Sequence, residues 1–214
     1  MNLYPINLKL EGRLCLVVGG GPVGERKISG LLECGAGVRV VSPGATALVA
    51  RWAEAGRITL LRREFIPADL AGVFLVLAAT DSAATNEKVA TLAAERGLLV
   101  NVADTPPLCD FYLPAIARRG PLSIAVSTGG VSPGLAARLR DEAAALCGPE
   151  YEEYLELLAA YRQKAFALWP REEEERREIL LRLTGAEALR RLDENGLSGL
   201  RSYLADLWAE YARS

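Results

Sequence analysis

The segment from Leu14 to Lys27, LCLVVGGGPVGERK, constrains the fold of this chain more than any other stretch. Its apolar run ends abruptly in glycines, and a helical pattern follows. In the G-x-G-x-x-G spacing the first glycine permits a sharp turn, the second lets a pyrophosphate approach the backbone, and the third lets the helix pack closely on the strand. The spacing predicts a dinucleotide site at a helix start, where free N–H groups favour phosphate. Its residues would be Gly19, Gly21, Pro22, Val23 and Gly24.

The glycine spacing has a second explanation, because 20 of the 214 residues are glycine. A strand–turn–helix corner can need glycines for steric reasons alone. The segments that follow favour the dinucleotide site, since apolar strands expected at 38–41, 58–61, 73–78 and 98–102 alternate with helical patterns. This alternation predicts an α/β fold over residues 1–112, a Rossmann-like doubly wound parallel sheet.

The pattern changes after residue 112. Extended stretches at 111–116 and 122–127 flank residues 118–121, Arg-Arg-Gly-Pro, which we expect to form a hairpin-like turn, and a helix is expected at 135–146. From Glu150 onward the pattern is helical, with breaks near Pro170, Gly185 and Gly196. We predict a small α+β dimerisation segment at 113–148 and a C-terminal helical domain at 149–214. Exposed apolar strands need a covering surface, so we expect a homodimer.

Charge and residue usage exclude several classes of function. The formal net charge of −2 implies no general attraction to nucleic acid or to a membrane. The sequence shows no signal pattern and no apolar run of membrane-spanning length, so we expect a cytoplasmic protein. It contains no histidine, and its four cysteines form no C-x-x-C pair, so we predict no resident metal site.

Ligands of doubly wound sheets bind at the carboxyl ends of the strands. The second strand is followed by Ser42, Pro43 and Gly44, where an NAD site usually has an acidic residue, and no basic pair follows for a 2′-phosphate. We therefore favour NAD over NADP. The fourth strand ends at Thr80 and Asp81, although Asp81 could simply cap the next helix.

Asp104 follows the fifth predicted strand, in the segment Asn-Val-Ala-Asp-Thr-Pro-Pro at 101–107. A carboxylate at that strand end would point into the cleft near the place of a nicotinamide. The alternative is an aspartate that only forms a turn ahead of two prolines. The sequence pattern alone does not separate these two interpretations.

Four motifs together resemble one family. They are Gly-Gly-Gly-Pro-Val-Gly-Glu-Arg-Lys at 19–27, Ala-Ala-Thr-Asp at 78–81, Asn-Val-Ala-Asp at 101–104 and Val-Ser-Thr-Gly-Gly-Val-Ser-Pro at 126–133. Their order and spacing resemble the precorrin-2 dehydrogenase/sirohydrochlorin ferrochelatase family of siroheme biosynthesis, closely over residues 1–150. Two positions depart from it, since Gly24 replaces an expected alanine and Thr128 stands where serine is frequent.

The resemblance implies a homodimer that oxidises precorrin-2 to sirohydrochlorin with NAD, and that inserts ferrous iron in bifunctional members. It implies that Asp104 matches the catalytic aspartate, which would accept the proton as NAD accepts the hydride. The substrate carries many carboxylates, so its pocket needs cations. The substrate-binding candidates are Arg118, Arg119, Thr128, Arg138 and Arg140.

We expect dehydrogenation to be robust. We expect iron insertion to be slow or absent, because the chain has no histidine to offer the incoming metal. Two other functions stay open at this point. One is an NAD-dependent dehydrogenase of another small acid. The other is a regulatory domain that senses a nucleotide and has no turnover.

Overall fold

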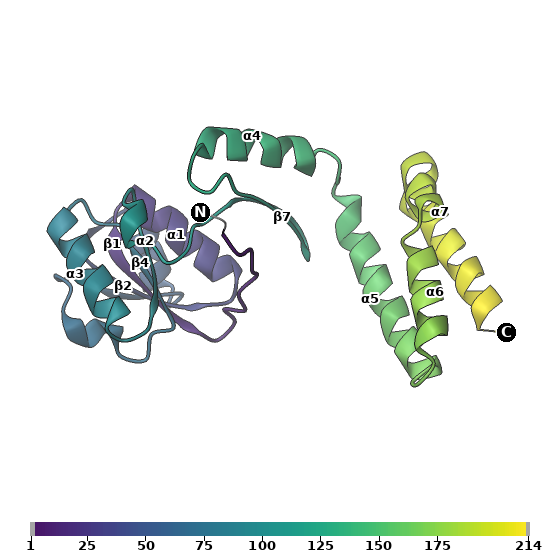
Figure 1. Ribbon diagram of the computed structural model, residues 1–214, viewed down its shortest axis with the longest axis horizontal. Coiled ribbons are helices and arrows are strands. Elements are labelled where there is room, and N and C mark those ends of the chain that lie inside the picture. Colours follow the sequence, from purple (N-terminus) through teal and green to yellow (C-terminus); the bar gives the residue numbers. More distant parts are fainter. Residues whose placement is uncertain (1–2, 213–214) are drawn as a thin grey trace. The chain divides into compact units, whose positions relative to one another are not determined.

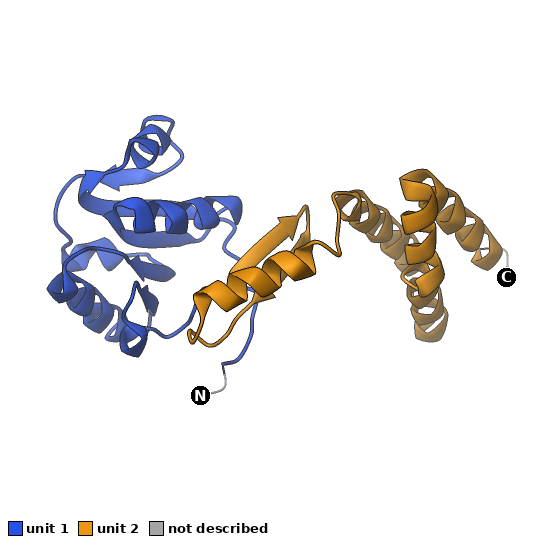
Figure 2. Ribbon diagram, turned by 90° about the horizontal axis from the view of Figure 1, so that it is seen from above, with its two compact units in different colours: residues 1–113 blue, residues 114–214 orange. Residues whose placement is uncertain are grey.

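The computed structural model describes residues 3–212 and divides after Leu113 into two compact units, shown in different colours in Figure 2. Unit 1 runs up to Leu113 and unit 2 begins at Pro114. Each unit is a separate body with its own elements and its own apolar packing. The finer division of the second part at residue 148 stays a prediction.

Unit 1 is built on a five-stranded sheet whose strands all run parallel (Figure 1). The strand order is β3-β2-β1-β4-β5, the order of a doubly wound nucleotide-binding sheet, so the predicted fold class is confirmed. The strands are β1 (Leu14–Gly20), β2 (Gly37–Ala45), β3 (Thr59–Leu61), β4 (Leu75–Ala78) and β5 (Leu99–Val102). The connecting helices are α1 (Pro22–Glu33), α2 (Ala47–Glu54), α3 (Ala83–Ala94) and the short 3-10 turns η1 (Pro67–Leu70) and η2 (Pro106–Leu108).

Both faces of this sheet are covered, because successive side chains of β1 point to opposite sides. Cys15 and Val17 pack into one apolar cluster with residues of α1 and α2. Leu16 and Val18 pack into the other cluster, to which α3 contributes. Burial on both faces explains why the strand is a continuous apolar run rather than an alternating one.

Strand β2 is longer than its apolar run predicts. The sequence suggests an end at Val41 and a loop at 42–44, but β2 continues to Ala45. Its register with β1 shifts between Val18 and Gly20, so residues 42–44 form a bulge before Ala45 pairs with Gly20. A Cβ on Gly20 would lie 2.6 Å from the carbonyl oxygen of Gly44. The strand can continue because that glycine lets the two backbones approach.

Unit 2 begins with the antiparallel hairpin β6 (Ala115–Arg119) and β7 (Leu122–Val126). The predicted turn at 118–121 is too wide and the first extended stretch starts too early. Arg119 pairs directly with Leu122, so both arginines lie in β6 and the turn is only Gly120 and Pro121. Gly120 has a φ of 52°, which a glycine adopts at little cost. Helix α4 (Pro133–Ala144) packs on this hairpin.

Three helices complete unit 2: α5 (Glu150–Leu168), α6 (Glu173–Leu183) and α7 (Ala186–Tyr211). They share one apolar cluster that includes Tyr154, Ile179 and Leu200. The predicted breaks near 170 and 185 separate these helices, and Gly196 bends α7 with a φ of 64° and a ψ of −165°. Across residues 3–212, none of the helices has both the length and the apolar character needed to span a bilayer.

Candidate functional site

The three glycines after β1 do different work. Gly19 has a φ of 112°, and a Cβ there would lie 2.2 Å from the carbonyl oxygen of Ala79. A Cβ on Gly24 would lie 2.1 Å from the carbonyl oxygen of Gly19. Steric need therefore accounts for these two glycines, which bring the loop and α1 close to the sheet. It does not account for Gly21, where a Cβ would meet no atom within 4 Å.

Open space at Gly21 lies directly before the first turn of α1. Gly21 is the N-cap, with an extended φ of −74°, and no side chain caps the helix. Pro22 occupies the first helical position and carries no N–H group. The N–H groups of Val23 and Gly24 have no partner within an α-helix at these positions, so they are free to meet an anion. An open helix start with free N–H groups is an arrangement that binds anions such as a pyrophosphate.

A carboxylate from α1, that of Glu25, lies next to the end of β2, where Ser42 was the only polar side chain that the sequence predicted. The Thr46 hydroxyl donates a hydrogen bond of 2.5 Å to Glu25 Oε2, and the same hydroxyl oxygen accepts from the backbone N–H of Val49 at the start of α2. Ser42 is half-buried, whereas Pro43 and Gly44 are exposed. Sequence reasoning missed the pair of Glu25 and Thr46. The signal available in the sequence was Glu25 itself, an acidic residue in the first turn of α1.

The end of β4 is organised by Thr80. Its hydroxyl donates to Asn86 Oδ1 at 2.8 Å and accepts from the backbone N–H of Ser82. Ser82 caps α3 by accepting from the Thr85 N–H, so the alternative that Asp81 caps this helix is wrong. Asp81 is exposed and remains a predicted cofactor residue.

Asp104 lies in the turn after β5 and is exposed. Its φ is 57°, the only positive φ of a non-glycine residue within residues 3–212. Asp tolerates this left-handed region better than most residues, but it still carries strain, and such strain concentrates at functional sites. The backbone N–H of the preceding Ala103 donates to Ala78, so this turn is tied to the end of β4. The turn-forming interpretation therefore describes Asp104, and its place in a cofactor cleft stays a prediction.

Lys27 connects the glycine helix α1 with β5, the strand that precedes the Asp104 turn, a contact that sequence reasoning missed. Its Nζ donates to Asn101 Oδ1 at 2.7 Å, and Asn101 Nδ2 donates to the carbonyl oxygen of Phe111 at 2.9 Å. Burial lowers the pKa of Lys27, while the nearby Cys109 and Asp104 act in the opposite direction. The signal available in the sequence was the position of Lys27 at the end of the glycine motif.

The predicted substrate-binding residues all lie in unit 2, on different elements. Arg118 and Arg119 are in β6, and the Arg119 guanidinium donates to the Arg118 carbonyl. Arg138 Nε donates to Glu142 at 2.8 Å on the exposed face of α4. Thr128 Oγ1 donates to the Ser132 carbonyl and accepts from its N–H. The next arginine along α4, Arg140, donates to Asp141.

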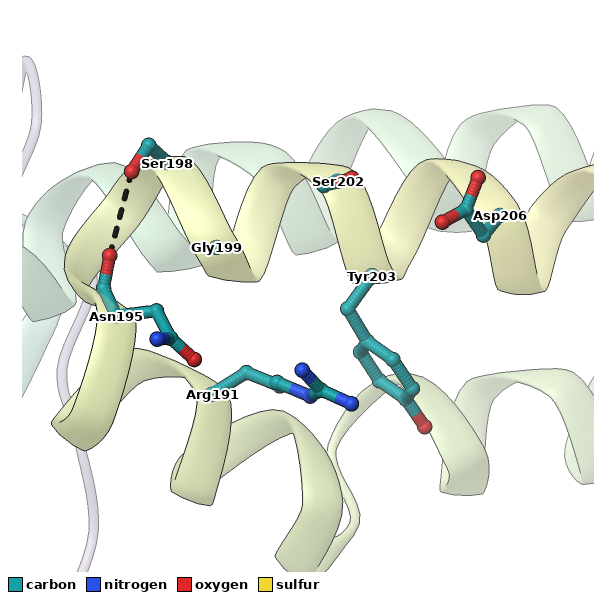
Figure 3. Close-up of a pocket in the computed structure, with 7 residues that line it drawn as sticks. All are labelled: Arg191, Asn195, Ser198, Gly199, Ser202, Tyr203 and Asp206. Atoms are coloured by element: carbon teal, nitrogen blue, oxygen red, sulfur yellow. Dashed lines mark hydrogen bonds between the residues drawn. The ribbon is translucent and has the colours of Figure 1, made fainter.

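A separate hollow of about 570 Å³ lies at the bend of α7 (Figure 3). It is lined by Arg191, Asn195, Ser198, Gly199, Ser202, Tyr203 and Asp206. The guanidinium of Arg191 is already paired with Glu187 at 2.8 Å. The lining belongs to one helix and follows from its bend at Gly196, so the hollow is a local feature of unit 2.

Comparisons with known proteins agree with this geometry. A family profile described as putative NAD(P)-binding matches residues 6–115, and one described as the central part of sirohaem biosynthesis proteins matches residues 119–145. The first profile supports a nicotinamide dinucleotide as the cofactor of unit 1 and does not distinguish NAD from NADP.

Curated relatives carry the name siroheme synthase. That of Nitrosococcus oceani is 40% identical over 199 residues, which are 93% of this chain and 40% of the relative. That of Methylococcus capsulatus is 49% identical over 140 residues, which are 65% of this chain and 30% of the relative. The chain thus spans less than half the length of these relatives.

The solved structure of a protein named "SirC, precorrin-2 dehydrogenase" matches nearly the whole chain. The match has a TM-score of 0.76 and 28% sequence identity, and it covers 97% of this chain and 100% of the solved one. The chain therefore belongs to the putative NAD(P)-binding family of the first profile. The second profile, the siroheme synthase relatives and the solved structure confirm the resemblance that its sequence motifs indicate.

Proposed function

We propose that this chain oxidises precorrin-2 to sirohydrochlorin and uses NAD as the hydride acceptor. One observation carries the proposal: the open helix start at Gly21 and the strained Asp104 lie at the carboxyl edge of the same sheet, after β1 and β5. The names of the siroheme synthase relatives and of the solved precorrin-2 dehydrogenase support the choice of substrate.

The reaction removes two hydrogens from the macrocycle as one hydride and one proton. NAD supplies the hydride acceptor when it is bound at the start of α1. Asp104 is exposed and ionisable, so it can accept the proton at its carboxylate. Gly19 and Gly24 keep the cofactor helix close to the sheet, and Thr80 orders the neighbouring strand end. Asp81, beside Thr80, belongs to the same proposed cofactor site.

NAD is favoured over NADP by the charges at the end of β2. Residues 42–46, Ser-Pro-Gly-Ala-Thr, contain no lysine or arginine to hold a 2′-phosphate. The carboxylate of Glu25, hydrogen-bonded to Thr46, would repel that phosphate. Ser42, Pro43 and Gly44 then line the adenosine ribose. We expect NADP to bind at least tenfold more weakly than NAD in a direct titration, and equal affinities would contradict the assignment.

Unit 2 supplies the proposed substrate and partner contacts. Arg118, Arg119 and Arg138, with the Thr128 hydroxyl, are the residues we propose for the carboxylates of the tetrapyrrole. The segment also exposes several large apolar side chains, which we propose to be covered in a homodimer. They are Val131, Leu135, Leu139 and Leu146.

Ferrous iron is the less favoured substrate in this proposal. The chain has no histidine to meet the metal, and Cys109 Sγ is hydrogen-bonded to both the N–H and the carbonyl of Val102. Asp104 is then the remaining group that could remove the pyrrole protons. We propose that insertion is slow or absent. Anaerobic incubation with sirohydrochlorin and ferrous iron decides this, and fast insertion that survives Asp104→Ala would overturn it.

The proposed oxidation is tested by NADH absorbance with precorrin-2 and NAD. Asp104→Ala should lower kcat by about 10²-fold or more, because general-base catalysis contributes on that scale, and should leave NAD binding intact. Asp193→Ala, an exposed aspartate on α7, is the matched control and should behave as wild type. NAD binding without any NADH would instead favour a nucleotide sensor. Turnover with another small acid and none with precorrin-2 would favour a different dehydrogenase.

A further inference from the structure

Lys27 is a partly buried cation, and helix α1 does not need a charged side chain at this position. It lies in the second turn of α1, and its ammonium reaches Asn101 in β5, 74 residues away in the sequence. Within residues 3–212 the ammonium has no ion-pair partner, and its one hydrogen-bond acceptor is the Asn101 side chain. Burying a lysine without a counter-ion is unfavourable, so a compensating role is expected.

Asn101 passes this contact on to the loop that follows β5. Asn101 is only 7% exposed, and its amide nitrogen donates to the Phe111 carbonyl at 2.9 Å and to Cys109 Sγ at 3.5 Å. Cys109 in turn bonds to both backbone groups of Val102. The loop from 103 to 111 is therefore fastened at its far end to the strand from which it starts.

Asp104 lies at the near end of this fastened loop, in the left-handed conformation described above. A strained backbone persists only where its surroundings hold it. Charge acts in the same direction, because the Asp104 carboxylate is close enough to stabilise the charged form of Lys27. Cys109 acts likewise, and the exposed Arg26 opposes it. Lys27 is thus linked to the proposed base through the hydrogen bonds of the loop and through the attraction of opposite charges.

We propose that Lys27 is a positioning residue for Asp104. Through Asn101 it holds the 103–111 loop, and its positive charge orients the Asp104 carboxylate toward the cofactor helix. The expected effect on kcat rests on the proposed function. The expected effect on the 103–111 loop rests on the hydrogen-bond network alone. Lys27 needs no contact with the substrate to act in this way.

The first test is a double-mutant cycle on kcat for NADH production. Lys27→Met keeps the length of the side chain and removes the charge and the donor, and it should lower kcat at least tenfold with the NAD dissociation constant within about threefold of wild type. If Lys27 acts through Asp104, the double variant with Asp104→Ala should be within about twofold of Asp104→Ala alone. Independent, multiplying losses would overturn the proposal, as would a normal kcat for Lys27→Met.

The second test needs no turnover. Hydrogen–deuterium exchange should rise about tenfold in the peptides covering 103–111 of Lys27→Met, and stay unchanged in Lys88→Met, an exposed lysine on α3. Lys27→Gln, which also removes the charge, serves if Lys27→Met does not fold. Unchanged exchange in the folded variant would overturn the positioning role. If wild type makes no NADH from precorrin-2, the proposed function fails, and this exchange result alone decides the role of Lys27.

Discussion

Replacing Gly21 with valine separates the two explanations of the glycine motif. The backbone there is extended, with a φ of −74° and a ψ of −174°, which valine adopts readily and which the following Pro22 also favours. A Cβ at this position meets no atom within 4 Å. The protein itself therefore has room for the new side chain, and the added atoms occupy only the space before the first turn of α1.

The expected sizes of the two effects are very different. Losing a glycine N-cap costs up to about 1 kcal/mol of unfolding free energy, and the reduced freedom of the unfolded chain returns about 0.4–1 kcal/mol. Stability should therefore change little. A pyrophosphate pushed away from the helix start loses at least one charge-assisted hydrogen bond, about 1.5–3 kcal/mol. That loss raises the NAD dissociation constant about tenfold or more.

Isothermal titration with NAD and thermal unfolding measure both quantities on the same sample. Gly30→Val is the matched control, because Gly30 lies within α1, also has no neighbour within 4 Å and is remote from the helix start. Gly19→Ala gives the opposite pattern, since its φ of 112° and the contact with Ala79 predict a loss of more than about 2 kcal/mol in stability. A folded Gly21→Val variant that binds NAD as wild type would refute the proposed site.

Three further predictions concern stability and assembly. The Arg63 guanidinium bonds both carboxylate oxygens of the buried Asp69 and lowers the pKa of Asp69 below its usual 3.8. The stability from this pair is therefore complete above pH 3.8 and is lost as the pH falls through the lowered pKa. Asp69→Asn should lower the free energy of unfolding by about 1–3 kcal/mol at pH 7. The difference in unfolding free energy between wild type and variant should shrink as the pH falls, and a constant difference would contradict the account. The Tyr154 hydroxyl donates to the Leu183 carbonyl at 2.7 Å, and burial raises the pKa of Tyr154 to about 12; Tyr154→Phe should cost about 1–2 kcal/mol and remove the last-titrating phenol from the ultraviolet titration curve. Sedimentation at micromolar concentration should find a dimer that Leu135→Glu, on exposed α4, converts to monomer, and a monomeric wild type would refute the assembly.

Local sequence patterns determined much of unit 1. The apolar runs at 73–78 and 98–102 must be buried, and the glycines, prolines and caps between them stop each element. Strand and helix alternation then leaves few possible sheet orders, because parallel connections are right-handed and short. For the same reason the sequence could predict that Gly21, Thr80 and Asp104 follow strand ends.

Contacts between distant segments were not predictable in this way. The hydrogen bond from Lys27 to Asn101 depends on how far a helix side chain reaches across the edge of the sheet. The continuation of β2 depends on the close approach of Gly20 to Gly44. No local pattern distinguishes a strand that stops at Val41 from one that bulges and pairs again.

The sequence by itself determined which residues stand at the carboxyl ends of the strands, because burial and turn propensity act over a few neighbouring residues. Only the tertiary structure decided what those residues meet. It separated the glycines required by packing from Gly21, which is not, and it put Asp104 into a left-handed backbone. The requirement for glycine at position 19 is set by a neighbour remote in sequence, the Ala79 carbonyl, and the hold that we propose on Asp104 depends on another long-range contact, Lys27 with Asn101.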